Sequence, residues 1–183
     1  FDMQAGSVFG PVANADALLD PSRRDPRLAA YVLSNGDTFK DEVLETFNGG
    51  RNGQPLANAT PTSFYLKKFV IEKTSFTTGS IRTYAHIYPL YRLSEVYLNY
   101  AEALFEATGN SEFSGSLEGV TYSMSAREAL NKVRAAYGMP EVPSSSAANF
   151  RTRLRNERRV ELCFEGHRFW DIRRWKIASE CTK

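Results

Sequence analysis

The feature that most constrains this chain is a run of apolar residues spaced three or four apart between residues 89 and 108. The run consists of Leu90, Leu93, Tyr97, Tyr100, Ala101 and Leu104. Residues at this spacing share one face of an α-helix. Pro89 suits the first helical position, where no N–H is needed, and Gly109 with Asn110 favours a helix end. The pattern predicts a helix over 89–108 that buries this face.

Three further helices are predicted toward the C-terminus, over 126–137, 150–164 and 167–177. Ser125 and Glu128 form a capping box at the start of the first, in which each side chain satisfies the other's backbone donor. The expected buried stripes are Ala126, Ala129, Leu130, Val133 and Tyr137 on the first, and Phe150, Leu154, Val160 or Glu157, Leu162 and Phe164 on the second. Antiparallel helix pairs of this kind pack like tetratricopeptide repeats, although no repeat of about 34 residues is visible.

Residues 1–88 are of a different kind, because they hold many Gly, Asn, Pro, Ser and Thr and few long periodic runs. Such a composition is typical of loops. The elements expected here are short helices at 16–19 and 28–33, a turn over 48–53, and one or two short strands within 63–76. The expected fold is therefore mainly α: a loop-rich portion over 1–88 with few short strands, and tetratricopeptide-like helical pairs over 89–183.

Composition excludes few functions. The net charge is +2, which is too small to indicate a polyanionic partner by itself. No stretch is apolar for long enough to span a bilayer. Cys163 and Cys181 do not make a disulfide framework, and Cys163 lies in an apolar helical pattern where a buried thiol is expected. His86 and His167 are too isolated to predict a metal site.

Two long motifs carry a family resemblance. Residues 88–103 read YPLYRLSEVYLNYAEA, and residues 156–175 read NERRVELCFEGHRFWDIRRW. Shorter landmarks are DPRL at 25–28, YLKKF at 65–69, NKVR at 131–134 and GMP at 138–140. In residues and in order, these segments resemble the SusD/RagB family.

The resemblance implies an outward-facing lipoprotein of a Gram-negative outer membrane. Family members lie over SusC-like TonB-dependent transporters and capture oligosaccharides, or in some cases peptides, without catalysis and without a required cofactor, although some bind calcium. The chain begins at Phe1 without a signal peptide and stops at Lys183, short of the family's usual C-terminal segment. We therefore expect a fragment of one larger domain, with the lipid anchor in the missing N-terminal part and with apolar helix faces exposed enough to cause some self-association.

The signature residues of the two motifs are expected to be structural. They are Arg92, Glu95, Glu102, Glu157, Arg158, Glu161, Glu165, Arg168, Asp171, Arg174 and Trp175. The glutamates at 157, 161 and 165 form a carboxylate row at helical spacing. Arg153, Arg158 and Arg168 lie three or four residues from members of that row, and Arg174 lies three from Asp171. Pairing along the helix or between helices follows from this arrangement.

The signature residues also allow two functional interpretations, nucleic-acid binding and catalysis. Residues 150–176 hold nine Arg or Lys against four Asp or Glu, with aromatic residues between them, a composition that suits a phosphate backbone. The regular alternation of acid and base favours internal pairing over nucleic acid. A glycosidase needs two carboxyls facing each other across a sugar, whereas Glu102 with Glu106, or Glu157 with Glu161, would lie side by side on a helix. We expect neither nucleic-acid binding nor catalysis.

A glycan site, if this chain holds part of one, is expected in residues 1–88. Sugars are bound by aromatic rings and by hydrogen bonds from Asn, Asp and Arg. The candidate ligand residues are Phe39, Phe47, Asn48, Arg51 and Asn52, with Asp37 and Asp41 nearby. The alternative is that this segment is a solvated connector. The leading function is glycan capture, and the alternatives are a tetratricopeptide-like interaction scaffold or a RagB-like peptide-binding protein.

Overall fold

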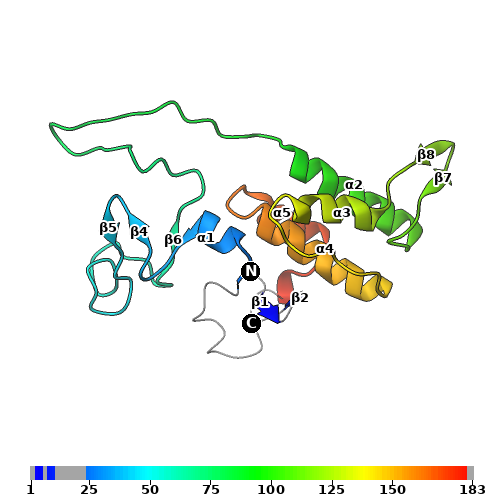
Figure 1. Cartoon of the computed structure of the whole chain (residues 1–183), viewed down its shortest axis with the longest axis horizontal. Helices are drawn as coiled ribbons and strands as arrows, with labels where there is room; N and C mark the ends of the chain where they lie inside the picture. The colour runs from blue at the N-terminus through cyan, green and yellow to red at the C-terminus, as the bar shows by residue number, and fades with distance from the viewer. Residues whose placement is uncertain (1–2, 6–7, 11–23, 181–183) are drawn as a thin grey trace. The chain divides into compact units, whose positions relative to one another are not determined.

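A computed structural model describes residues 3–5, 8–10 and 24–180 of the chain. Contacts divide the chain into a helical unit, Phe1–Arg27 with Tyr91–Lys183, and a loop-rich unit, Leu28–Leu90 (Figure 1). The sequence had suggested a division after residue 88 and had grouped residues 1–27 with the loops. Asp25 and Arg27, which precede the loop-rich unit, form ion pairs within the helical unit. None of the helices in the described part has the length and hydropathy to cross a membrane.

The helical unit is built from α2 (Leu93–Thr108), α3 (Ala126–Ala135), α4 (Ala147–Glu161) and α5 (His167–Arg174). A hairpin of β7 (Gly115–Leu117) and β8 (Val120–Tyr122) joins α2 to α3, and a short 3₁₀ turn (Ala178–Glu180) follows α5. Helix α2 packs against both α3 and α4, as Figure 1 shows. The buried core consists of Leu98, Ala101, Phe105, Ala126, Ala129, Leu130, Val133, Val142, Phe150, Leu154 and Leu162.

Helix α2 begins later than the spacing predicted. Residues 89–92 are not helical, and Arg92 is the extended N-cap residue with φ −144° and ψ 159°. Leu90 is 90% exposed and Leu93 is 65% exposed, so the predicted apolar face was wrong at its start. The buried apolar side chains are Leu98, Ala101, Leu104 and Phe105, because α3 and α4 cover that side of the helix. The end was predicted correctly: Gly109 caps α2 at φ 65°, in the left-handed region that glycine tolerates.

Helices α3 and α5 begin at the predicted residues and end early, at Ala135 and Arg174, whereas α4 differs at both ends. The capping box of α3 is confirmed: Ser125 Oγ accepts from the Glu128 N–H at 3.2 Å, and Glu128 Oε2 accepts from the Ser125 N–H at 2.7 Å. Helix α4 starts at Ala147 after the N-cap Ser146 and ends at Glu161, three residues before the predicted positions at both ends. Phe164 therefore lies beyond the helix and is 51% exposed, contrary to its predicted burial.

The loop-rich unit has little regular structure. Strand β3 (Val32–Leu33) pairs antiparallel with β6 (Tyr65–Leu66), and β4 (Thr38–Phe39) pairs with β5 (Glu42–Val43). The helix expected over 28–33 is only partly present, since α1 (Arg27–Tyr31) ends where β3 begins. One strand within 63–76 is confirmed, and the remainder contributes a single bridge between Ser75 and Arg82. The helix expected at 16–19 lies outside the described residues, which do include a hairpin of β1 (Met3–Ala5) and β2 (Val8–Gly10).

Candidate functional site

The most unusual chemistry of the helical unit lies on the buried face of α4. Glu157 and Glu161 are four residues apart, so both carboxylates lie on one face of the helix. That face is the interior one: Glu157 is 2% exposed and Glu161 is fully buried. A buried carboxylate is tolerated only when it is paired and hydrogen-bonded. The partners of these two groups therefore decide what the site can do.

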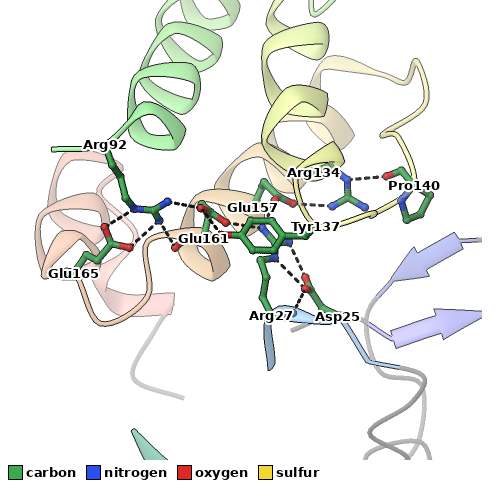
Figure 2. Close-up of polar contacts among 9 residues, drawn as sticks. All are labelled: Asp25, Arg27, Arg92, Arg134, Tyr137, Pro140, Glu157, Glu161 and Glu165. Carbon is green, nitrogen blue, oxygen red and sulfur yellow. Dashed lines mark hydrogen bonds and ion pairs between the residues drawn. The ribbon is translucent and has the colours of Figure 1, made fainter. Parts of the chain in front are cut away.

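Arg27 is the central partner and is itself 1% exposed (Figure 2). Its Nε and Nη2 donate to the two carboxylate oxygens of Asp25 at 2.9 and 2.6 Å. Its Nη1 donates to Glu157 and, at 3.1 Å, to Oε2 of Glu161. The guanidinium also lies over the Tyr137 ring, 5.2 Å from its centroid. Burial acts to lower the pKa of Arg27, but the hydrogen bonds and charges of Asp25 and Glu157 outweigh it and raise the pKa, so the cation is permanent.

Arg134 on α3 also pairs with the Glu157 carboxylate. Its Nη1 donates to Glu157 Oε2 at 2.7 Å, and its Nε donates to the Pro140 carbonyl at 2.9 Å (Figure 2). Glu157 therefore accepts one hydrogen bond from Arg27 and another from α3. Both of its oxygens are used in ion pairs.

Arg92 holds the start of α2 against the end of α4. Its Nη1 donates to Glu161 Oε1 at 2.5 Å, and its Nη2 donates to the Glu161 carbonyl at 2.7 Å. Its Nε and Nη2 also donate hydrogen bonds to the two carboxylate oxygens of Glu165, at 2.8 and 2.7 Å (Figure 2). Burial lowers the pKa of Arg92, but the bonds to Glu165 and Glu161 more than compensate and raise it.

A second cluster connects α2, α4 and α5. Arg158 Nε donates to both oxygens of the buried Asp171 at 3.0 and 2.9 Å, and its Nη1 donates to Asn99 at 2.6 Å. Arg174 bridges Asp171 and Glu102, and the Trp175 indole donates to Glu102 at 2.6 Å. Burial raises the pKa of Glu102, but its bonds to Arg174 and Trp175 outweigh that effect and lower it.

The arrangement shows one of the two kinds of pairing that the sequence left open, along the helix or between helices. The carboxylate row forms ion pairs with arginines from distant segments, Arg27, Arg92 and Arg134. The row faces the interior, whereas Arg158 reaches Asp171 across to α5. The expected pair of Arg174 with Asp171 is present at 2.9 Å.

The remaining signature residues lie at the edges of these clusters. Glu95 on α2 is buried, and its carboxylate lies 3.6 Å from His167 Nε2 at the start of α5. Arg168 is half-buried on α5. Cys163 is half-buried instead of fully buried, so its predicted environment was only partly right. Within the described ranges, no group of three or more His, Cys, Asp or Glu side chains is placed to hold a metal ion.

The candidate ligand residues lie in the loop-rich unit, and the structure separates them into two groups. Phe39 and Asn52 line a cavity of about 280 Å³. Phe47, Asn48 and Arg51 do not line it: Phe47 is 54% exposed, and Arg51 pairs with Glu45 at 3.1 Å on the surface. The lining consists of Leu33, Phe39, Leu44, Asn52, Leu56, Ala57, Asn58, Ala59, Tyr65 and Leu66. Sequence reasoning missed most of this lining, because isolated Leu and Ala residues in a loop carry no ligand signal.

Comparisons with known proteins agree with the motifs. The model of the SusD family matches residues 13–183. A solved SusD-like protein from Bacteroides fragilis is 26% identical, with a TM-score of 0.71 over 87% of this chain and 30% of its own. A SusD-like carbohydrate-binding protein from the same organism is 30% identical, with a TM-score of 0.69 over 93% of this chain and 33% of its own.

The chain thus spans about a third of the length of these solved relatives. None of the curated proteins matches it. Because the family model covers nearly the whole sequence and the solved relatives share its fold, the chain belongs to the SusD family.

Proposed function

We propose that this protein is a non-catalytic binding protein that captures oligosaccharides at the cell surface for import through a SusC-like TonB-dependent transporter. The observation that carries the proposal is the family match over residues 13–183, together with a 30% identical solved relative described as carbohydrate-binding. The helical unit also supports a non-catalytic role, because its neighbouring glutamate side chains form ion pairs with arginine side chains.

We propose that the chain is not catalytic because its neighbouring carboxylates form ion pairs with arginines. A glycosidase needs one carboxyl that stays protonated to act as the acid and a second that faces it across the sugar. Glu157 and Glu161 share the Arg27 guanidinium, and Glu161 and Glu165 share Arg92. Each of these carboxylates is therefore engaged by a guanidinium group and does not face a second carboxyl across an open cleft. The side-by-side glutamates therefore fit a role in holding three helices together.

Nucleic-acid binding is disfavoured by the same pairing. Among the basic residues of 150–176, Arg158 is buried against Asp171, Arg151 pairs with Glu106 and Arg174 pairs with Glu102. A cation whose charge is neutralised by a neighbouring carboxylate releases few counterions from a phosphate backbone. We propose that this segment is an internal scaffold.

The proposed ligand residues are Phe39, Phe47, Asn48, Arg51 and Asn52 of the loop-rich unit. We also propose that the chain is part of a longer outer-membrane lipoprotein, since it spans about a third of its solved relatives. In that arrangement the lipid anchor and further helices belong to the rest of the protein.

Affinity gel electrophoresis against a panel of polysaccharides tests the proposed function. The 183-residue chain and the longer lipoprotein are run side by side. Retardation of the longer protein by a glycan that it does not shorten is the expected result, and the second lane shows whether this chain holds the site. If no glycan retards the longer protein, the proposal is wrong, and a peptide ligand or a protein-interaction scaffold becomes the better account.

A further inference from the structure

The cavity of the loop-rich unit has an apolar interior. Leu33, Leu44 and Ala59, which line it, are buried, and the rings of Phe39 and Tyr65 contribute to its wall. Leu56 and Leu66 also line the cavity but are about half exposed, at 53% and 46%. Its volume of about 280 Å³ lies just below the range of about 300–1,000 Å³ for small-molecule sites. A site of this size suits a single sugar unit or one substituent of a longer chain.

The cavity walls are held in place by contacts within the unit. The Tyr65 hydroxyl donates to the Asn52 carbonyl at 2.6 Å, and Asn52 Oδ1 accepts from the Glu45 N–H at 3.1 Å. Gln54 Nε2 donates to the Ala59 carbonyl at 2.7 Å. A preformed site loses less conformational freedom on binding and so binds more tightly.

Gly53 is required by the path of the same loop. A Cβ atom at this position would lie 1.9 Å from the Phe47 carbonyl oxygen, so any other residue would force the loop to move. The loop that carries Asn52 is therefore packed closely against the segment that precedes it.

The polar groups of the lining are all uncharged. No Asp, Glu, Lys or Arg lines the cavity, which disfavours an ionic ligand. Nδ2 of Asn52 and the side-chain amide of Asn58 have no hydrogen-bond partner among the described residues. Two carboxamides beside an apolar interior match a ligand that carries an amide next to a methyl group.

We propose that this cavity binds the acetamido group of an N-acetylhexosamine unit in the captured glycan. The methyl group would lie against Leu33, Leu44 and Ala59, and the amide would exchange hydrogen bonds with Asn52 and Asn58. This inference rests on the proposed glycan capture and adds the substrate class. It also assigns ligand contact to Asn58, Leu56 and Tyr65, which the sequence did not single out.

Two disaccharides provide a matched test. N,N′-diacetylchitobiose and cellobiose have the same linkage and differ only in carrying acetamido or hydroxyl groups. Titration of each into the 183-residue chain, followed by saturation-transfer NMR, is expected to show about tenfold tighter binding of the first, which corresponds to about 1.4 kcal/mol. The acetyl methyl protons are expected to receive the strongest saturation. Equal affinities, or saturation confined to other protons, would overturn the assignment.

Asn58→Gly removes the amide while keeping the backbone, because Asn58 has φ 69° and glycine adopts that conformation freely. We expect at least about fivefold weaker binding of the acetylated disaccharide, within the range for loss of a hydrogen bond. Phe76→Ala is the control, because this ring is exposed, does not line the cavity and is not among the proposed ligand residues. Circular dichroism establishes that both variants fold. Equal losses in the two variants would place the ligand elsewhere.

The results distinguish the acetamido assignment from the broader proposal of glycan capture. If polysaccharides without acetamido groups retard the chain as strongly as chitin-type polymers do, glycan capture stands and the acetamido assignment fails. If no sugar binds and leucine amide, which carries no acetamido group, perturbs the same cavity residues, both fail and the cavity accepts an apolar peptide side chain.

Discussion

Arg27 and Glu157 lie 130 positions apart in the sequence and form a buried ion pair in the helical unit. The arginine precedes the loop-rich unit and the glutamate lies on α4, near the end of the chain. The pair therefore closes a long stretch of chain and ties the segment around Asp25 to the helices. Its burial means that neither partner can be lost without leaving the other charge in an apolar environment.

Replacement of Arg27 by Met should destabilise the helical unit strongly. The variant leaves Asp25, Glu157 and Glu161 buried with one cation fewer, and losing one partner of a buried pair costs about 3–5 kcal/mol. Thermal unfolding should show a fall in Tm of about 6–20 °C, at about 2–4 °C per kcal/mol for a chain of this size. Arg51→Met, at an exposed pair with Glu45, is the control and should change Tm by little. Similar shifts in the two variants would contradict the structural role of Arg27.

The free energy of unfolding should fall in acid, because protonation of Glu102 weakens its contacts in the folded protein. Its pKa in the folded protein is lowered by Arg174 and Trp175, so the unfolded chain binds the proton more readily. The stabilisation is fully present above the ordinary glutamate pKa of about 4.5 and is lost as pH falls through the lower pKa of the folded state. Urea unfolding between pH 6 and pH 3 should show a steeper loss for the wild type than for Glu102→Gln. Parallel curves would show that this contact does not contribute.

The capping box of α3 provides a local test. Ser125→Ala removes the oxygen that accepts from the Glu128 N–H and should cost about 1 kcal/mol in the free energy of unfolding. The measurement is denaturant unfolding followed by circular dichroism. Ser123→Ala, on an exposed residue outside the helix, is the control and should have no measurable effect. A loss of the same size in both variants would argue against the cap.

The sequence predicted the helices well because their signals are local. The capping box at Ser125 and the glycine after Thr108 specify helix ends through neighbouring residues alone. The buried face of α2 was harder to predict, because tertiary contacts with α3 and α4 decide which of two apolar stripes is covered. Leu90 fitted the spacing but precedes the helix.

The site residues were also only partly predictable from the sequence, because their contacts come from distant segments. The glutamates of α4 were recognised from their spacing, but their partner Arg27 lies more than a hundred positions away and has no local signature. Phe39 and Asn52 were chosen because their residue types bind sugars, and they do line the cavity. Phe47 and Arg51 were chosen for the same reason and lie outside it. Residue type identifies sugar-binding candidates, whereas the cavity depends on how the loop folds.

Capture without hydrolysis is the central claim, and one experiment tests it most directly. The longer lipoprotein and this chain are run in native gels that contain individual polysaccharides, and the same mixtures are analysed for released oligosaccharides. The account predicts that at least one glycan retards migration and that no shorter products appear. Product release would contradict the non-catalytic role of the paired glutamates, and unretarded migration in every gel would contradict glycan capture itself.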